Sequence, residues 1–145
     1  MWRLLCLTAL AIAQGSLYAL GNEWTSVGPE GGSYWQILID PQSPGIFYAT
    51  TSAGLFRSKD GGASWNNVGL NGFAVYGLTI DPQQPDTLFA AATNSRPDED
   101  TIVNIFKSTD GGVSWKESDS GLSGCCVQSL GIDPQNTGTL YGSSV

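Results

Sequence analysis

Short apolar runs separated by turn signals recur along the chain after residue 23. In the first repeat these runs cover Trp35–Ile39, Ile46–Thr50, Leu55–Ser58 and Trp65–Val68. Runs rich in β-branched and aromatic residues, bounded by Gly, Pro, Asn or Asp, are typical of β-strands. The pattern therefore predicts four strands in each repeat and an all-β fold.

The runs belong to an internal repeat. The segment Ile37–Leu70 is echoed by Leu78–Leu122, and a third copy starts at Leu130. The second copy is longer, mainly because of an insertion between Thr93 and Ile105. The tetrapeptide Ile-Asp-Pro-Gln marks every copy, at residues 39–42, 80–83 and 132–135. A unit repeated at this length indicates that each copy is one supersecondary unit that packs on its neighbours.

A second marker is an octapeptide with Ser, Asp, Gly and Trp at fixed spacing, at residues 58–65 and 108–115. The spacing suits a tight hairpin turn, in which Ser and Asp side chains accept hydrogen bonds from turn amides and Gly adopts a positive φ. The Trp is expected to fold back onto the apolar face of the sheet. We expect a structural role, and not catalysis or metal binding, for Ser58, Asp60, Gly62, Trp65, Ser108, Asp110, Gly112 and Trp115.

These octapeptides resemble the Asp box, S-x-D-x-G-x-[ST]-W, also called the BNR repeat, of the sialidase, sortilin and xyloglucanase propellers. The resemblance extends over essentially everything after residue 23 and implies a β-propeller of four-stranded antiparallel blades. Two blades and part of a third cannot close a ring of about four to eight blades, so an N-terminal fragment of about two and a half blades is expected. The predicted parts are an outer strand (23–28), blade one (35–69), blade two (76–122) and the start of blade three (127–145).

The first residues are typical of a secretory signal peptide, because Arg3 precedes the uncharged run Leu4–Ala13 and small residues follow. Cleavage after Ala13 fits the small-x-small rule, whereas cleavage after Ala19 fits the usual length. We expect a signal peptide over 1–19 and a partial propeller over 20–145. A membrane anchor is the alternative, but the run is about half the ~20 residues that a spanning helix needs. The expected location is secreted or periplasmic, without membrane insertion after cleavage.

The composition argues against several classes of function. The chain holds 19 Gly and 7 Pro, only 13% of its residues are charged, and its formal net charge is −7. An acidic chain is a poor partner for phosphate backbones, so no nucleic-acid binding is predicted. The absence of histidine removes Ser-His and Cys-His catalysis and imidazole metal ligation from this stretch. No cofactor and no metal site are predicted.

The Asp-Pro turns join the first and second strands of a repeat, and the octapeptides join the third and fourth. Because successive strands run in opposite directions, both kinds of turn are expected on one face of the propeller. The opposite face carries the loops in which such folds place ligand sites. Its aromatic residues are candidates for stacking on sugar rings, with packing between blades as the alternative. Its clustered acids are candidates for glycoside cleavage or calcium binding, although adjacent acids on a loop are more often simply solvated. The candidate ligand-face residues are Tyr34, Trp35, Ser52, Tyr76, Arg96, Asp98, Glu99 and Asp100.

Two families of enzyme share features with this chain, and each needs particular residues. The layout of the first blade is similar to that of xyloglucan-cleaving propellers, in which a T-D-x-G-G segment supplies a catalytic aspartate. Here the matching stretch is Thr51–Leu55, and Ser52 stands in place of the carboxylate. Sialidases require three clamping arginines, and the segment after the predicted leader holds only Arg57 and Arg96. Neither activity can be assigned from these residues.

Cys125 and Cys126 are adjacent on a loop between blades. In an exported chain they are candidates for disulfide bonding. A bond between neighbouring cysteines is a strained ring, so partners elsewhere and free thiols stay open as alternatives.

Two functions remain. The first is an exported Asp-box propeller that acts as a binding or scaffold module for a polysaccharide or an extracellular protein. The alternative is the N-terminal part of a glycoside hydrolase, xyloglucanase-like or sialidase-like, whose catalytic carboxylates lie beyond residue 145. The chain itself is not expected to be an enzyme.

Overall fold

A computed structural model describes residues 17–20, 23–26, 28–29, 32–94, 103–118 and 127–144. Over residues 17–20 and 23–26 it describes the backbone only. These ranges form strands joined by turns, and they contain no helix long and apolar enough to cross a membrane.

The strands repeat in the predicted order. The first strands of the three repeats are β3 (Tyr34–Ile39), β7 (Phe73–Ile80) and β11 (Val127–Ile132). The second strands are β4 (Phe47–Thr51), β8 (Leu88–Asn94) and β12 (Leu140–Ser144). The third and fourth strands are β5 (Gly54–Ser58) and β6 (Asn66–Asn67), then β9 (Val103–Ser108) and β10 (Lys116–Glu117). The hairpin β1 (Leu17–Leu20) and β2 (Glu23–Ser26) precedes them.

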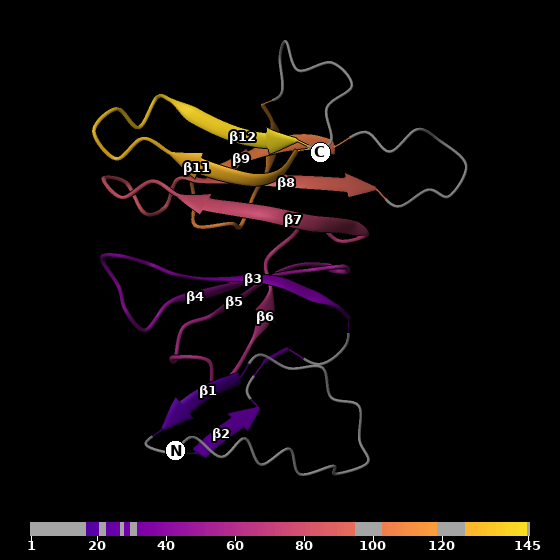
Figure 1. Ribbon diagram of the computed structural model, residues 1–145, viewed down its shortest axis with the longest axis vertical. Helices are drawn as coiled ribbons and strands as arrows, with labels where there is room; N and C mark the ends of the chain where they lie inside the picture. Colours follow the sequence, from indigo (N-terminus) through magenta and orange to yellow (C-terminus); the bar gives the residue numbers. More distant parts are fainter. Residues whose placement is uncertain are drawn as a thin grey trace.

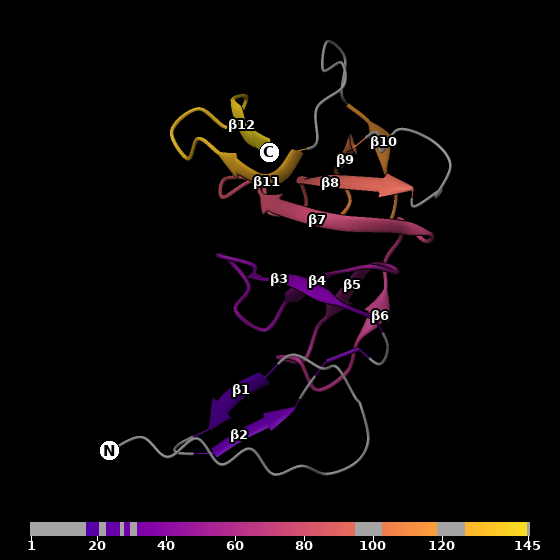
Figure 2. The same ribbon diagram turned by 45° about the vertical axis from the view of Figure 1, so that its right-hand side comes forward.

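The sheets are antiparallel and follow the chain. Blade one has the order β3-β4-β5-β6 and blade two mirrors it as β7-β8-β9-β10, while β11–β12 and β1–β2 are two-stranded sheets. Figures 1 and 2 show the four sheets stacked in chain order, with β1–β2 beside blade one and β11–β12 beside blade two. The predicted all-β fold with four-stranded antiparallel blades is confirmed.

The hairpin at the start of the described chain differs from the expectation. A strand was expected at 23–28, and β2 lies there, but it pairs with β1, with Leu17 opposite Ser26 and Leu20 opposite Glu23. Residues 17–19 had been assigned to the leader.

The main core lies between blades one and two. Its most buried large apolar members are Leu55, Val75 and Leu88 at 0% exposure and Leu78 at 1%. Each such side chain contributes about 1.5–3 kcal/mol through burial. The whole cluster is Tyr48, Leu55, Leu70, Val75, Leu78, Ile80, Leu88, Ala90, Ala92 and Phe106. A smaller cluster of Ala91, Ile105 and Val127, with Leu130 packed against it, joins blade two to β11.

Polar contacts also join consecutive blades. The Tyr48 hydroxyl and the Arg57 guanidinium in blade one both donate to the carbonyl of Gly111 in blade two, at 3.2 and 3.1 Å. Arg57 lies over the Tyr48 ring, and burial raises the pKa of the Tyr48 phenol. In blade two, Lys107 lies over the ring of Phe89 in the same way.

Trp115 connects its own turn to the neighbouring blade. Its indole N–H is shared between the carbonyls of Gly112, at 3.0 Å, and Val68 in blade one, at 3.2 Å. The ring covers Gly69, which has φ of +119° and leaves only 2.9 Å between an added Cβ and the Trp115 ring. Both the backbone conformation and the contact therefore require glycine at residue 69.

We predict that Gly69→Ala destabilises the fold by about 1–3 kcal/mol, because the new Cβ meets Trp115 and alanine is strained at this φ. The measurement is urea denaturation followed by tryptophan fluorescence. Gly131→Ala is the matched control, because an added Cβ there meets nothing within 4 Å. Equal stability of the Gly69→Ala and Gly131→Ala variants would contradict the packing described.

Candidate functional site

The two faces of the sheet stack are chemically different. One face, called the turn face here, carries the Asp-Pro turns and the octapeptide turns. Backbone hydrogen bonds join the two kinds of turn, from Gly61 N to Gly45 O at 3.0 Å and from Gly111 N to Asp86 O at 2.9 Å. The opposite face, called the loop face, carries the ends of the second strands and the starts of the first and third strands, because Thr51 pairs with both Tyr34 and Gly54.

In the first octapeptide turn, the described hydrogen bonds of Asp60 are internal to the turn. Ser58 Oγ donates to Asp60 Oδ1 at 2.7 Å and accepts from Gly62 N at 2.8 Å. The backbone N–H and the hydroxyl of Ser64 both donate to the Asp60 carboxylate. The Trp65 indole donates to Gly62 O at 3.0 Å. The carboxylate thus organises its own loop.

The second octapeptide turn reproduces the first. Ser108 is bonded to Asp110 at 2.7 Å and to Gly112 N at 2.9 Å, and Ser114 N donates to Asp110 at 2.9 Å. The two central glycines of each turn have φ between +68° and +95°. Ser58 and Ser108 are buried, at 0% and 2% exposure.

The Asp-Pro turns use a carboxylate in a similar way. Asp40 Oδ1 accepts from Gln42 N at 2.8 Å and Ser43 N at 3.1 Å. Asp81 and Asp133 accept from the equivalent pairs of amides in the later repeats. These are Asx turns, in which the side chain replaces a backbone acceptor. The turn face therefore uses its described aspartates to hold loops.

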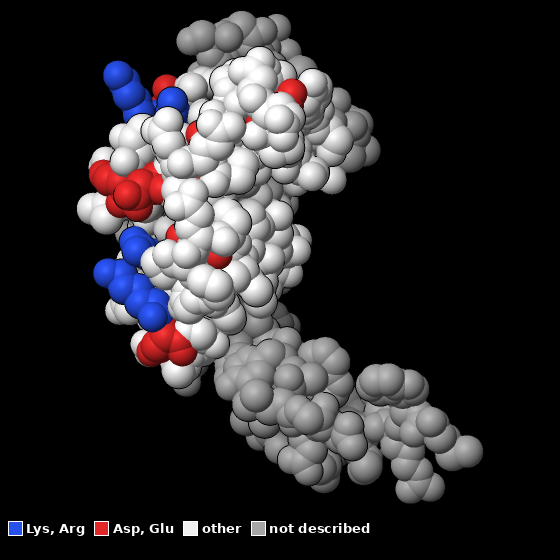
Figure 3. All heavy atoms as spheres, turned by 90° about the vertical axis from the view of Figure 1, so that its left-hand side faces the viewer, with Lys and Arg blue, Asp and Glu red and all other residues white. Residues whose placement is uncertain are grey.

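The loop face contains an open groove of about 410 Å³. Its walls come from the first strands of three consecutive repeats. The lining residues are Trp35, Gln36, Tyr76, Gln128 and Ser129. None of these side chains carries a charge near neutral pH, and β3, β7 and β11 contain no Asp, Glu, Lys or Arg. Figure 3, which looks at the turn face, shows charged side chains gathered along one edge of it.

A β-bulge at the same point of each first strand shapes this groove. The register shifts between Tyr34 and Gln36 in β3, between Val75 and Gly77 in β7, and between Val127 and Ser129 in β11. The extra residues are Trp35, Tyr76 and Gln128. Bulges re-aim side chains and are frequent beside functional sites. Here each of the three bulged residues lines the groove.

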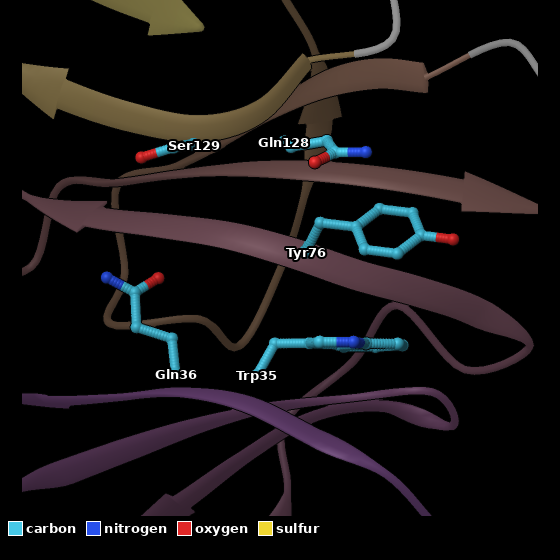
Figure 4. A pocket seen from close by; sticks show the side chains of 5 residues that line it. All are labelled: Trp35, Gln36, Tyr76, Gln128 and Ser129. Atoms are coloured by element: carbon cyan, nitrogen blue, oxygen red, sulfur yellow. The ribbon is translucent and has the colours of Figure 1, made fainter. Parts of the chain in front are cut away.

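Trp35 and Tyr76 form an aromatic pair at one side of the groove. Their ring centroids are 4.8 Å apart and the ring planes are tilted by 47°. Figure 4 shows both rings extending in the same direction from β3 and β7, with the Gln128 amide on the far side of Tyr76. Trp35 is 43% exposed. An indole face is thus available to solvent beside polar amides.

Gln36 and Gly77 set the width of the groove. Gln36 Oε1 accepts from Leu78 N at 2.9 Å, so its side chain spans the gap between β3 and β7. Gly77 is the equivalent residue one repeat later. A Cβ there would lie 3.1 Å from Gln128 O and 3.2 Å from Ser129 Cα, so β11 approaches β7 so closely that an added side chain would push the two strands apart slightly.

The structure brings together part of the predicted ligand face. Trp35 and Tyr76 line the groove, but Tyr34 and Ser52 do not. Tyr34 donates its hydroxyl to the Pro29 carbonyl. Ser52 Oγ accepts from Ser33 N at 3.1 Å and ties the β4–β5 turn to the start of β3.

Other predicted residues lie outside the described part of the chain. They are Arg96, Asp98, Glu99, Asp100, Cys125 and Cys126. Within the described residues, no three His, Cys, Asp or Glu side chains are grouped so that they could hold a metal ion.

Gln36, Gln128 and Ser129 were missed. The repeat contained the signal, since Gln128 aligns with Trp35 and Tyr76, and Ser129 aligns with Gln36 and Gly77. Neither aromatic character nor charge marks the amides and the hydroxyl at those positions.

Comparisons with known proteins identify the fold. No protein-family model and no curated protein matches the chain. Among solved structures, an ancestral GH74 enzyme matches with a TM-score of 0.65 and 21% identity over 82% of this chain and 17% of that chain. The GH74 xyloglucanase from Xanthomonas campestris and the GH74 enzyme from Niastella koreensis match with TM-scores of 0.42 and 0.44, each at 16% identity over 86% of this chain. These two scores are too low to carry a structural conclusion.

The fold is that of part of a β-propeller, and it is similar to the fold of the ancestral GH74 enzyme. The chain spans 17% of the length of the ancestral enzyme and 31% of each of the other two. At this level of identity the likeness concerns the fold alone.

The octapeptide turns predict a dependence of stability on pH. Hydrogen bonds from the side chain and backbone of Ser64, and then from Ser58, lower the pKa of Asp60 from 3.8 to about 2. Ser114 and Ser108 do the same for Asp110. A lowered folded-state pKa stabilises the fold fully above the unfolded value of 3.8, and this contribution is lost as the pH falls toward 2.

We predict that the melting temperature falls on acidification from pH 4 to pH 2, and that it falls less steeply in the double variant Asp60→Asn/Asp110→Asn. Melting is followed by circular dichroism at several pH values in that window. The slope is the readout, because the amides also lower stability at neutral pH. An identical slope in the variant and the unmodified chain would show that these carboxylates do not titrate as described.

Proposed function

We propose that this chain is the N-terminal part of an exported Asp-box β-propeller that binds a neutral polysaccharide in the groove between its first strands. The observation that carries the proposal is the bulge repeated in β3, β7 and β11, which turns Trp35, Tyr76 and Gln128 into one groove. In a regular strand the neighbours Trp35 and Gln36 would point to opposite faces, whereas both line the groove beside the bulge.

The chemistry of the lining favours sugar. An exposed indole face and a tilted phenol ring provide apolar surfaces for the C–H faces of pyranose rings, while amides and a hydroxyl bond to ring hydroxyls. Ligand sites combine apolar walls with a few placed polar groups in this way. The flanking groups are Gln36, Gln128 and Ser129.

The absence of charge in the lining favours a neutral ligand. An acidic sugar requires cationic partners, and none of the lining residues supplies one. The formal net charge of −7 would also repel a polyanion over long range. A protein ligand is less well supported, because stable protein interfaces bury about 1,200–2,000 Å² and this groove is small.

The groove supports binding more than cleavage. Glycoside hydrolysis requires two carboxyl groups on either side of the scissile bond, and none of the lining residues carries one. Ser52, at the position of the expected aspartate, is engaged with Ser33. In this proposal the octapeptide turns are structural Asp boxes, and Asp60 and Asp110 act only within them. Export is proposed from the leader-like residues at the start of the chain.

We predict that the full chain binds xyloglucan oligosaccharides and that Trp35→Ala weakens binding at least tenfold, because the stacking surface is lost. Tyr76→Ala should have a similar effect, and Trp35→Phe a smaller one, since a ring is kept. Affinities are measured by isothermal titration calorimetry, with polygalacturonate as the charged comparison. Val113→Ala is the control, because Val113 is 74% exposed on the turn face.

Three results would change this assignment. Unaltered affinity in the Trp35→Ala and Tyr76→Ala variants would place any binding outside the groove. Failure of the full chain to bind neutral glucans, xylans and mannans would reject the proposed ligand class. Release of reducing sugar from xyloglucan would favour the hydrolase alternative.

A further inference from the structure

Three dipeptides in this sequence have a side chain that can close a five-membered ring with the backbone nitrogen of a following glycine. They are Asp60-Gly61, Asn71-Gly72 and Asp110-Gly111. Glycine favours this reaction, because it has no Cβ to block the approach of its nitrogen to the side-chain carbonyl carbon. The three pairs lie in different surroundings, and these surroundings decide which of them can react.

The two aspartyl pairs are protected by the octapeptide turns. The carboxylates of Asp60 and Asp110 each accept hydrogen bonds from two serines of their own turn. Their lowered pKa of about 2 keeps them ionised near neutral pH, and a carboxylate is a poor target for a nucleophile. The attacking nitrogen is also engaged, since Gly61 N donates to Gly45 O at 3.0 Å and its counterpart in the second turn makes the equivalent bond. Ring closure would break all of these contacts.

The asparaginyl pair has no such protection. It lies in the turn between the last strand of blade one and the first strand of blade two, which Phe73 N closes by donating to Leu70 O at 3.0 Å. Asn71 and Gly72 are both exposed. Among the described residues, neither the Asn71 amide nor the Gly72 nitrogen has a hydrogen-bond partner. A Cβ on Gly72 would meet nothing within 4 Å, so the ring has room to form.

The backbone of this turn is held by its neighbours. Leu70 has φ of +54°, and no other non-glycine residue in the described ranges has a positive φ. A bulky side chain is rarely found in this conformation. Leu70 keeps it because its side chain is buried in the core between the blades, at 8% exposure. A change in chain length within the turn would therefore act on both blades.

We propose that Asn71 is a site of spontaneous deamidation in the folded protein, with water as the co-reactant. The Gly72 nitrogen loses its proton and bonds to Asn71 Cγ, while the Cγ–Nδ2 bond breaks and ammonia leaves with that proton. Water then opens the resulting succinimide. Attack at Cγ leaves an aspartyl residue, and attack at the main-chain carbonyl carbon leaves an isoaspartyl residue, in which the chain runs through the former side chain.

The modification alters the loop face and the core beneath it. Both products add a negative charge to the loop that precedes β7. The isoaspartyl product also lengthens the main chain by one methylene between Leu70 and Phe73, which opens the hydrogen bond that closes the turn. The Phe73 ring packs edge-on against Phe106, with centroids 5.2 Å apart, so the disturbance reaches the contact between the blades. This inference does not depend on what the groove binds.

The experiment is incubation of the full chain at about 37 °C and neutral pH, both native and in urea, followed by peptide mapping with mass spectrometry. We expect Asn71 to gain about 1 Da in the native chain at no less than about a tenth of its rate in urea, because an exposed turn opens at little cost. The rate should rise with pH, since the attacking nitrogen must lose its proton. Isoaspartyl formation at Asp60 and Asp110 should be slower in the native chain than in urea.

Asn71→Gln is the matched control, because it keeps an amide but must close a larger ring. This variant should not lose stability on incubation, whereas the unmodified chain should acquire a second population with a lower melting temperature. Asn71→Asp adds the charge without the extra methylene. When fresh, it should melt close to the fresh unmodified chain.

Three results would overturn the proposal. The first is an unmodified Asn71 in the native chain under conditions in which the same residue reacts in urea. The second is deamidation spread evenly over the asparagines of the native chain. The third is an equal loss of melting temperature in the incubated Asn71→Gln variant.

Discussion

The four-stranded sheets of this molecule have two apolar faces, and that constraint governs the rest of the described structure. A single four-stranded sheet cannot hide both faces from water, so a blade is stable only between neighbours. Blade two satisfies the requirement on both sides, with blade one against Leu78 and Ile80 and β11 against Ala91 and Ile105. The gradient of exposure from the middle of the stack to Ile39 and Tyr141 follows directly.

The octapeptide turns serve the same requirement. Each turn ends in a tryptophan that is fixed to its own loop by a bond to Gly62 or Gly112. Trp115 then reaches across to Val68 of the preceding blade. A turn that is rigid through internal hydrogen bonds can hold a large ring at a defined height and angle, and that ring links the blades. The hydrogen bonds within the turn thus help to fix the position of one blade relative to the next.

The fold could be read from the sequence to a large extent because the repeat shows every element more than once. The four strands of blade one lie within about one or two residues of the predicted runs, and strand parity placed both kinds of turn on one face. The fourth strand is shorter than predicted, since only Asn66 and Asn67 pair with β5. Strand β1 was not predicted, because the apolar residues at the start of the chain have the pattern of a leader. That pattern carries no information about the strand with which they pair.

The groove was predicted less well, for a physical reason. Alternation along a regular strand would have sent Trp35 and Gln36 to opposite faces, and the bulge that brings both into one groove leaves no mark on the hydrophobic pattern. Tyr34 and Trp35 looked equivalent as aromatics at the start of a strand. Only the register, with its shift between Tyr34 and Gln36, separates the residue that ties down Pro29 from the residue that faces the groove.

The repeated bulge has a consequence for how such a surface can change over time. At that one position the three repeats carry Trp, Tyr and Gln, whereas the turns on the far side keep Asp, Pro, Ser, Gly and Trp almost unaltered. An unpaired residue does not contribute to the ladder, so it can be exchanged with little effect on folding. Recognition and architecture are thereby assigned to separate sets of residues. A library randomised only at the bulges would explore new specificities on an unchanged scaffold.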